Sequence, residues 1–319
     1  MKPRIVLVTP ALADANNGNW QTARRYARLL APLYRVRLGA EWRAGDAEGE
    51  LLLALHARKS ASSIAAWPAD RPVVLVLTGT DLYADIQHDA AAQASLARAN
   101  ALVLLNREGA AALPPTLRGK AQVILQSCAA HLGGPRPRRT LRAVVVGHLR
   151  AEKDPRTLFA AVRQLADRSD VRIDHLGAAL DPALGAEALQ LMRDCPHYRW
   201  LGSRLHAEAR RRIARANLLI HPSRLEGGAH VVMEALRSGT PVLASRIAGN
   251  TGLLGADWPG LFEPGDAQGL ARQLLRLRDD PTILPAWSEL ATERAQAFDP
   301  IHERNALLML VQQLLENSP

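Results

Sequence analysis

Two glutamates eight positions apart, Glu226 and Glu234, flank a glycine pair in the stretch LEGGAHVVMEALRSGTPVLAS, which begins at residue 225. The glycine pair disfavours regular structure, whereas residues 231–237 have the spacing and propensity of a helix. Glu226 is therefore expected in a loop and Glu234 within a helix. The free amide groups at the start of that helix would lie between the two carboxylates, where they could bind an anion.

This arrangement of two carboxylates around an anion site suits a particular kind of ligand. Carboxylates accept hydrogen bonds from hydroxyl groups, and the amides of a helix start bind phosphate. A nucleotide sugar, with phosphates between two hydroxylated rings, has all of these features. The same residues are equally compatible with an ordinary glycine turn and surface glutamates, since such turns are frequent in α/β proteins.

The strands and helices that must position these residues can be predicted from the sequence, because short apolar runs alternate with amphipathic helical segments. Alternation of this kind is typical of βαβ units with parallel sheets. The expected strands are residues 5–8, 51–55, 73–77, 101–105 and 123–125 in the first part of the chain, and 143–146, 171–175, 218–220 and 241–244 in the second.

The segment GGPRPRR, residues 133–139, separates the two sets of strands. Its glycines and prolines extend neither a helix nor a strand, so the domain boundary is expected near residue 138. Residues 301–315 carry apolar side chains at helical spacing and follow the break at residues 298–300, which predicts a separate last helix.

The composition excludes several classes of protein. The 319 residues suffice for two domains and contain no apolar run of about 18 residues that would predict a transmembrane helix. The apolar run in the N-terminal stretch MKPRIVLVTP is too short for a secretory signal and predicts a first buried strand. Cys128 and Cys195 are far apart, which indicates neither a disulfide framework nor a zinc site. We expect a soluble, cytoplasmic protein.

The formal charge of +9 is compatible with nucleic-acid binding. Arginine is spread along the whole chain instead of being collected in one basic tail, however. Anionic small substrates explain the charge equally well, and neither a membrane nor a nucleic-acid partner is expected.

The residues around the two glutamates resemble a known family. The segment NLLIHPSRLEGGAHVVMEALRSGTPVLAS, residues 217–245, resembles the donor-site signature of the retaining glycosyltransferases of family 4, in which a Glu-x7-Glu motif follows a strand and a Pro-Ser turn. VVVGHLRAEKDPRTL, residues 144–158, resembles the loop of that superfamily that holds the donor diphosphate. WLGSRL, residues 200–205, resembles the loop that covers the nucleobase.

The resemblance implies an α/β protein of GT-B architecture, with two facing Rossmann-like domains, parallel sheets and a cleft between them. Residues 1–137 would form the acceptor-binding domain and residues 138–299 the donor-binding domain, with the helix at 300–319 packing back on the first domain. Glu226 would contact hydroxyl groups of the donor sugar, and Glu234 those of the ribose. The implied donor-binding residues are His148, Arg150, Lys153, Arg204, Gly228, Ala229, His230, Val231 and Glu234.

The chain departs from the family pattern at two places. His148 stands where the superfamily usually has arginine after the glycine of the diphosphate loop. A lone loop histidine is more often structural, but in this context we assign it to the donor phosphate together with Lys153. The second departure is GGAH after the first glutamate in place of the commoner Gly-Phe-Gly-Leu, which leaves the role of His230 open.

Three polar loops follow strands of the first domain, where open α/β sheets bind ligands. They are NNGNWQTARR at 16–25, LHARKS at 55–60 and LTGTDLY at 77–83. Such loops are singly most often solvated, but together they predict an acceptor pocket rich in cations and hydroxyl groups. The acceptor-binding candidates are Asn17, Gly18, Asn19, Arg58, Lys59 and Thr80, and the catalytic candidates are His56, Asp81 and Glu226.

These loops and the short chain resemble a small branch of GT-B proteins, the selenosugar synthases of selenoneine biosynthesis. That family joins selenium from selenophosphate to the anomeric carbon of a UDP-sugar, chiefly UDP-N-acetylglucosamine. Selenium is a soft nucleophile on an acceptor that is already anionic, so cations that position it matter more than a strong base. The resemblance implies that the phosphoryl group later leaves selenium, and it makes a selenophosphate-producing enzyme a functional partner.

No metal ion or other cofactor is expected, because no Asp-x-Asp motif stands in a suitable loop and helix amides and cations would stabilise the leaving diphosphate. Two other functions remain compatible with the sequence. A conventional family-4-like glycosyltransferase with a hydroxyl acceptor should present a hydrophobic or sugar-sized groove. The other function is non-catalytic binding of a nucleotide sugar or of a nucleic acid. A nucleic-acid binding protein should carry a continuous basic stripe. Retention and inversion at the anomeric carbon both stay open.

Overall fold

The computed structural model describes residues 2–12, 18–131 and 133–317. The chain divides into two compact units, of which the first contains Met1–Ser127, Gly227–Ala229 and Asp299–Pro319, and the second contains Cys128–Glu226 and His230–Phe298. The division lies earlier in the chain than residue 138. Residues 128–137 belong to the second unit, where Arg136 donates to the Ser238 carbonyl at 2.9 Å and Asn217 donates to the Pro137 carbonyl at 2.9 Å.

The first unit is built on a six-stranded sheet in the order β2-β1-β3-β4-β5-β6, with every pairing parallel. Its strands are β1 (Arg4–Val8), β2 (Arg35–Gly39), β3 (Leu51–Leu55), β4 (Val73–Leu77), β5 (Ala101–Leu104) and β6 (Ala121–Val123). The central strands β3 and β4 are buried at every position, as expected of strands covered on both faces.

Two hydrophobic clusters lie on opposite faces of this sheet, because successive side chains of a strand point to opposite sides. One cluster joins Leu52 and Leu75 to the side of α2 (Ala61–Ala66) and α4 (Ala90–Arg98). The other joins Leu53 and Val74 to α1 (Gly18–Leu30) and α12 (Pro300–Glu316). On α1 the buried residues are Thr22, Ala23, Tyr26 and Leu30, whereas Trp20 and Ala27 are only partly buried.

The last helix, α12, is fixed to the first unit by a buried carboxylate as well as by apolar side chains. Glu303 is only 1% exposed and accepts two hydrogen bonds from Nε of Arg25, at 2.8 and 2.9 Å. It also accepts from the backbone N–H of Ser127 at 2.9 Å and from its hydroxyl at 2.5 Å. Burial raises the pKa of Glu303, and Arg25 and Ser127 oppose that shift.

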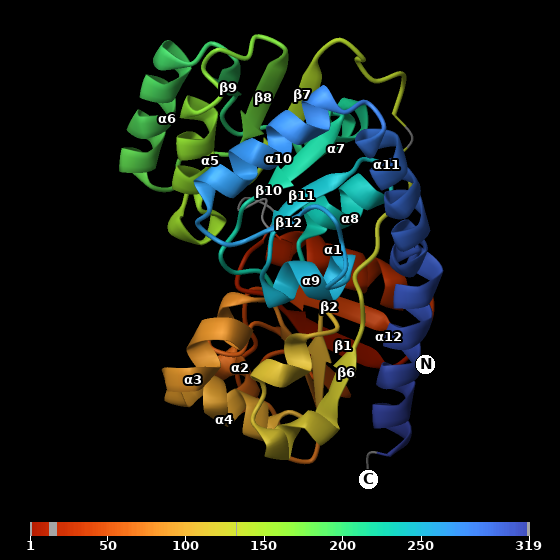
Figure 1. Ribbon diagram of the computed structural model, residues 1–319. Coiled ribbons are helices and arrows are strands. Elements are labelled where there is room, and N and C mark those ends of the chain that lie inside the picture. The colour runs from red at the N-terminus through yellow and green to blue at the C-terminus, as the bar shows by residue number, and fades with distance from the viewer. Residues whose placement is uncertain (1, 13–17, 132, 318–319) are drawn as a thin grey trace. The chain divides into compact units, whose positions relative to one another are not determined.

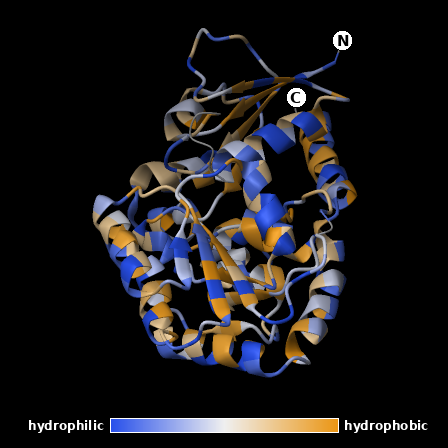
Figure 2. Ribbon diagram, turned by 90° about the horizontal axis from the view of Figure 1, so that it is seen from above, coloured by the Kyte–Doolittle hydropathy of each residue, from blue (hydrophilic) through white to orange (hydrophobic). Residues whose placement is uncertain are grey.

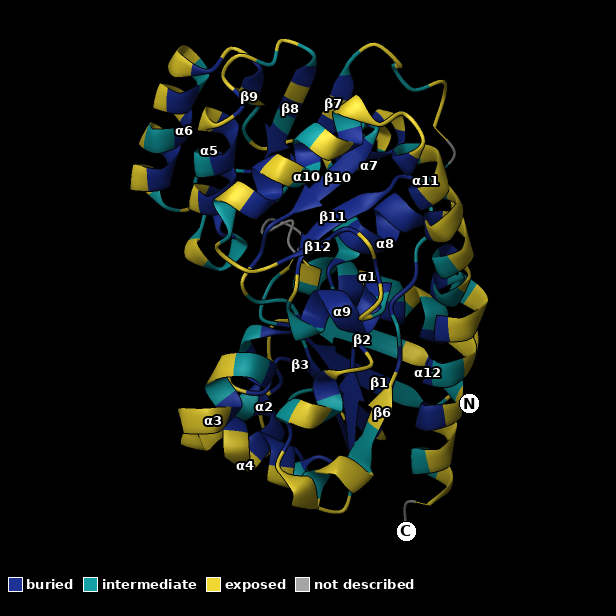
Figure 3. Ribbon diagram, in the orientation of Figure 1, coloured by how far each residue is buried: buried dark blue, intermediate teal, exposed yellow. Residues whose placement is uncertain are grey.

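The second unit contains another six-stranded parallel sheet, in the order β12-β11-β10-β7-β8-β9. Its strands are β7 (Leu141–Val146), β8 (Val171–Leu176), β9 (Tyr198–Trp200), β10 (Leu218–His221), β11 (Val242–Ser245) and β12 (Leu261–Phe262). Figure 3 shows β10 and β11 buried along their length, whereas β8 carries one exposed and one partly buried residue between buried ones.

Helices follow the strands of the second sheet and cover its two faces. They are α5 (Pro155–Arg163), α6 (Pro182–Asp194), α7 (His206–Arg215), α8 (His230–Leu236), α9 (Ala248–Leu254), α10 (Ala267–Asp279) and α11 (Ile283–Arg294). Apolar residues of α5, α6 and α10 form one core with β7 and β8, and Figure 1 shows α10 beside α5. Figure 2 shows that helices of the protein carry hydrophobic and hydrophilic residues together, as amphipathic covering helices do.

The predicted alternation of strands and helices is confirmed, and three strands were missed. They are β2, β9 and β12, and each lies at the edge of a sheet. Edge strands are short or polar because one side lacks a neighbour, so β2 reads RVRLG and β12 has two residues. The predicted strand at 123–125 ends at Val123 instead.

Two short elements complete the part of the first unit that bears on function. The loop after β4 leads into a π-helix, Asp81–Asp85, followed by α3 (Ile86–His88). Within the described residues, no helix combines the length and apolar character needed to cross a membrane.

Candidate active site

The carboxyl edge of the second sheet gathers titratable residues that follow its central strands. β7 ends at Val146 and leads through Gly147 into the loop that carries Lys153, while the neighbouring strand β10 ends at His221. Parallel α/β sheets bind ligands at this edge, because the loops that follow the strands diverge there. Glu226 follows β10 by five positions and meets both side chains.

Glu226 is held between two donors. Its Oε1 accepts from Nζ of Lys153 at 2.5 Å and lies 3.1 Å from Nε2 of His221, which in turn lies 3.3 Å from the Ser223 hydroxyl. Burial alone would raise the pKa of Glu226, but Lys153 and His221 together bring it well below its usual range. The carboxylate is therefore charged at neutral pH, and its side chain is 11% exposed. A charged acceptor of this kind can bind sugar hydroxyls.

His221 was not among the predicted site residues. It stands in the run LLIHPS as the last residue of a central strand, and a polar residue at that position is the signal that could have indicated it. Its side chain is 2% exposed and lies beside Glu226.

His148 lies in the loop after β7, as predicted, but its chemistry differs from that of the arginine it replaces. Its Nδ1 accepts from the Ala178 N–H at 3.0 Å, so the neutral ring carries its proton on Nε2. Burial, together with Arg150 and Lys153, lowers its pKa. His148 therefore offers one N–H donor and no positive charge at neutral pH, which leaves the charge of the loop to Arg150 and Lys153.

The backbone of this loop is fixed by a second histidine, His175 of β8. Its Nε2 donates to the Gly147 carbonyl at 3.1 Å, and its Nδ1 accepts from the Tyr198 hydroxyl at 2.9 Å. Burial lowers the pKa of His175 to about 4, so the ring is neutral. The loop also packs tightly on Gly177, where a Cβ would lie 1.9 Å from the Gly147 carbonyl oxygen.

Glu234 lies within α8, as predicted, and is 3% exposed. Its Oε1 accepts from Nε2 of His206 at 2.5 Å, and Nε of Arg210 lies 3.9 Å from the same atom. Both partners belong to α7 and neither was predicted. Arg204 of the predicted nucleobase loop is exposed and lies 3.6 Å from Glu208, so it does not join this cluster.

The glycine loop between the two glutamates is divided between the units. Gly227–Ala229 is counted with the first unit, where Asn106 donates to the Gly227 carbonyl at 2.7 Å. A Cβ at Gly228 would lie 2.8 Å from that of Leu105, which explains the requirement for glycine. His230 and Val231 open α8 in the second unit and are partly buried.

In the first unit, the predicted catalytic residue His56 has an unusual backbone. It follows β3 with φ of 73°, a left-handed conformation that a histidine adopts at a cost. The ring is 1% exposed, Nδ1 accepts from the Lys59 N–H at 3.4 Å, and Nε2 lies 3.2 Å from the Thr80 hydroxyl. Burial lowers the pKa of His56, against the opposing effect of Asp81. Strained buried residues of this kind concentrate at functional sites.

Asp81 holds the loops around His56. Its Oδ1 accepts from the N–H groups of Thr78 and Gly79 at 2.8 Å each, and its Oδ2 accepts from the Ala57 N–H at 2.9 Å. The carboxylate is fully buried, and Nδ1 of His56 lies 3.9 Å away. With its oxygens occupied by backbone amides, Asp81 acts as a positioning residue for the ends of β3 and β4.

The two cations predicted to bind the acceptor differ in their surroundings. Arg58 donates from Nε to Asp85 at 3.0 Å, and Asp85 also lies 3.8 Å from Nε2 of His56. The side chain of Lys59 is exposed and has no hydrogen bond or ion pair to another described residue. Asp85 was not predicted, although it stands one helical turn after Asp81 in the π-helix.

The remaining predicted acceptor residues lie at the start of α1. Gly18 is its first residue and is exposed, and Asn19 is partly buried. Asn17 lies outside the described residues. Over the described residues as a whole, no group of three or more His, Cys, Asp or Glu side chains is arranged to hold a metal ion.

The chain was compared with known proteins. Residues 140–280 match the family model described as glycosyl transferases group 1. No curated protein sequence matches the chain.

Several solved structures share the fold of the whole chain. Sucrose-phosphate synthase from Thermosynechococcus elongatus superposes with a TM-score of 0.81 at 17% identity, over 99% of this chain and 100% of that one. HepE from Anabaena, solved with UDP and glucose, superposes with a TM-score of 0.76 at 16% identity, over 98% of this chain and 100% of that one. A glycosyltransferase from Rickettsia africae superposes with a TM-score of 0.73 at 13% identity, over 99% of this chain and 100% of that one.

At these identities the superpositions show the fold alone. The matched segment adds sequence information, because it contains Lys153, His221, Glu226 and Glu234. The two six-stranded parallel sheets are thus those of the GT-B fold, and residues 140–280 are similar in sequence to glycosyl transferases of group 1.

Proposed function

We propose that this protein transfers the sugar of a UDP-sugar, with UDP-N-acetylglucosamine as the preferred donor, to the selenium of selenophosphate. The observation that carries the donor half is the buried, charged Glu226 between Lys153 and His221 at the carboxyl edge of the second sheet. A carboxylate held in the charged form accepts hydrogen bonds from sugar hydroxyls, and the lysine beside it is a ready partner for phosphate.

In the proposed reaction, selenium attacks the anomeric carbon and a C–Se bond forms. The C–O bond to UDP breaks, and its electron pair leaves with UDP. Lys153 and the N–H of His148 stabilise the charge that develops on the diphosphate, since preorganised donors act most strongly where charge grows. Glu234, with His206 and Arg210 as its neighbours, binds the ribose hydroxyls of the nucleotide.

The acceptor half rests on the exposed cation Lys59 beside the buried ring of His56. Selenophosphate brings its own negative charge and a soft nucleophile, so the site needs a phosphate-binding cation more than a base. Lys59 is available for that role because its side chain has no partner within the described residues. Arg58 contributes less, since its guanidinium is paired with Asp85.

A second candidate function, transfer to a hydroxyl acceptor, is favoured by one specific observation. His56 is buried with a lowered pKa, so it is neutral at pH 7 and suited to take a proton from an alcohol. Its proton-free nitrogen, Nδ1, accepts only the long 3.4 Å contact from the Lys59 N–H. Under this second function His56 would be essential, whereas selenium transfer would tolerate its replacement.

The experiment that separates the two functions supplies each acceptor in turn. The purified protein is incubated with UDP-N-acetylglucosamine and selenophosphate, and mass spectrometry is used to look for a selenium-containing sugar while UDP release is followed. The same assay is run with Glu226→Gln, and with Glu187→Gln on α6 as a carboxylate control distant in sequence.

The expected result is a selenosugar from the wild type and from Glu187→Gln, and strongly reduced product from Glu226→Gln. His56→Asn keeps a residue type that tolerates the left-handed backbone and should retain activity with selenophosphate. UDP release that requires a hydroxyl acceptor and is abolished in His56→Asn would establish the second function instead. Failure to bind UDP at all would contradict both.

A further inference from the structure

The second unit carries a groove rich in arginine that the proposed reaction does not use. Its floor is formed by residues 142–144 of β7, Asp174 of β8 and Arg199 of β9, and its wall by α7 and Ala216. The groove has a volume of about 410 Å³, within the range of small-molecule sites. The residues that line it are Arg142, Ala143, Val144, Asp174, Arg199, Glu208, Arg211, Arg212, Arg215 and Ala216.

The groove is separate from the candidate donor site. Arg142 lies near the amino end of β7, whereas Lys153 and the diphosphate loop follow the carboxyl end of the same strand. The groove also lies beside α7, while α5, α6 and α10 share their core with the other side of β7 and β8. A ligand in this groove would therefore not take the place of the nucleotide sugar.

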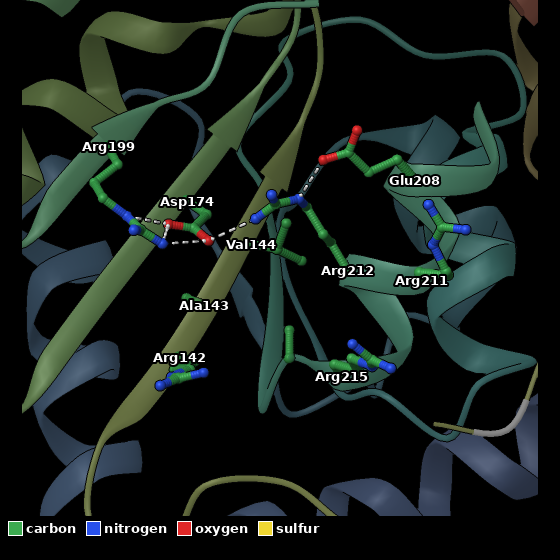
Figure 4. Close-up of a pocket in the computed structure, with 10 residues that line it drawn as sticks. Arg142, Ala143, Val144, Asp174, Arg199, Glu208, Arg211, Arg212 and Arg215 are labelled. Carbon is green, nitrogen blue, oxygen red and sulfur yellow. Dashed lines mark hydrogen bonds and ion pairs between the residues drawn. The ribbon is translucent and has the colours of Figure 1, made fainter. Parts of the chain in front are cut away.

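A chain of ion pairs crosses the groove and fixes two of its guanidinium groups (Figure 4). Arg199 donates to both oxygens of Asp174, at 2.8 and 3.0 Å. Arg212 donates to the same carboxylate at 3.2 Å and to Glu208 at 3.0 Å. The two guanidinium groups are thus held side by side on one carboxylate, and each keeps N–H donors that these bonds do not use.

Three further arginines bring uncompensated charge. Within the described part of the chain, the side chains of Arg142, Arg211 and Arg215 have no hydrogen bond or ion pair. Figure 4 shows Arg142 and Arg215 on the same side of the ion-pair chain. Arg142 is also paired in register with Arg172 of β8, and like charges on neighbouring strands destabilise a sheet. The groove therefore carries a net positive charge that a bound anion would neutralise.

We propose that this groove binds a small molecule with two or more phosphate groups. Guanidinium groups match phosphate oxygens in paired hydrogen bonds, and five arginines against two carboxylates exceed what a single phosphate would neutralise. The lining contains no aromatic residue on which a base could stack, and it forms a bounded groove instead of a stripe. The phosphates of the ligand, and not a nucleobase, supply the recognition.

The test is titration calorimetry with sodium tripolyphosphate at physiological salt. Saturating UDP is present throughout, so that phosphate binding at the donor site does not contribute. The groove variant is the double substitution Arg142→Gln with Arg215→Gln, which removes two exposed side chains that hold no structural partner. The matched control is Arg163→Gln with Arg276→Gln, since these exposed arginines lie on α5 and α10 and change the net charge equally.

We expect one tripolyphosphate site in the wild type and in the control, and affinity lower by about tenfold or more in the groove variant, because charge-assisted contacts to phosphate are lost. The thermal unfolding of both variants should match that of the wild type. Absence of binding to the wild type would overturn the proposal, and so would equal weakening in both double variants. A single-stranded RNA or an acidic peptide that binds through the groove where tripolyphosphate does not would overturn it as well.

Discussion

The candidate donor residues of the second unit and the candidate acceptor residues of the first are organised in opposite ways. In the second unit, Glu234 is buried and Glu226 is largely buried, and both already hold cationic or N–H partners, so the polar groups are fixed before a ligand arrives. In the first unit, His56 adopts a left-handed backbone and Lys59 extends from the surface without a partner among the described residues. Preorganised carboxylates suit a donor of defined shape, whereas an exposed cation suits a small mobile anion.

The largest effect is expected from breaking the ion pair of the second unit. Lys153→Met leaves the Glu226 charge with His221 alone, and the loss of one partner of a buried pair costs about 3 to 5 kcal/mol. Urea unfolding at pH 7 measures this loss. The double variant Lys153→Met with Glu226→Gln should recover most of the stability, because the unpaired charge is gone. A double variant no more stable than the single one would refute the pairing.

The next prediction concerns pH and tests the fixed donor loop of the second unit. The pKa of His175 is about 4 in the folded protein, against an ordinary value of 6.5, so between these values the unfolded chain binds the additional proton. Above pH 6.5 the neutral His175 makes its full contribution to the free energy of unfolding. That contribution, on the order of 3 kcal/mol, is lost as the pH falls toward 4. Because His175 holds the Gly147 carbonyl, the donor loop should lose order as His175 takes up a proton.

Unfolding measured at several pH values between 7 and 4 tests this. His175→Gln keeps a donor for the Gly147 carbonyl and removes the titration, so its stability should depend less steeply on pH than that of the wild type. Burial also lowers the pKa values of His56, His148 and His197, which leaves a remaining slope of the same sign. Equal slopes in the wild type and in His175→Gln would contradict the assignment.

A third prediction sharpens the assignment of the nucleotide. Glu234→Ala should weaken UDP binding by about 1 to 3 kcal/mol, the range for leaving buried polar groups without their partner. Glu187→Ala, which removes an exposed carboxylate of α6, is the control and should not change UDP affinity. Calorimetry that finds the same affinity in Glu234→Ala and in the wild type would remove the ribose assignment.

The acceptor side is expected to respond less strongly and more selectively. Lys59→Gln should raise the Michaelis constant for selenophosphate about tenfold and leave that for the UDP-sugar unchanged, since one charge-assisted contact is lost. Arg58→Gln should have a smaller effect because its guanidinium already binds Asp85. Arg35→Gln, at the amino end of β2, controls for net charge. If Arg58→Gln had the larger effect, the ranking of the two cations would be reversed.

The smallest effect is expected from chelation. The proposed donor site stabilises the diphosphate with Lys153 and with N–H groups, so activity should be unchanged in EDTA. Loss of activity on chelation that magnesium or manganese restores would show that this set of groups is incomplete.

The secondary structure could be predicted from the sequence wherever a strand is buried on both faces. Central strands such as β3 and β4 are continuous apolar runs, and both were predicted with their observed bounds. The edge strands β2, β9 and β12 were not, because a strand with one neighbour needs neither length nor apolarity. Arg136 of the proline-rich segment donates to the Ser238 carbonyl within the second unit, a contact that the composition does not encode.

The candidate site was accessible only in part, for a related reason. Glu226 and Glu234 share one short segment, so their spacing was visible in the sequence. Their partners come from other segments, as His206 is 28 positions from Glu234 and Lys153 is 73 positions from Glu226. The left-handed backbone of His56 could not be predicted, because composition favours glycine or asparagine at such a position.

The packing of α12 on the first unit affects the order in which the two units can finish folding. The bond between Arg25 and Glu303 joins residues 278 positions apart, and Leu307, Leu310 and Val311 belong to the core of the first unit. That core therefore stays open until α12 has left the ribosome, whereas the second unit depends mainly on residues 128–298. Long-range closure also slows folding. The unit that is synthesised first is thus the one that is finished last.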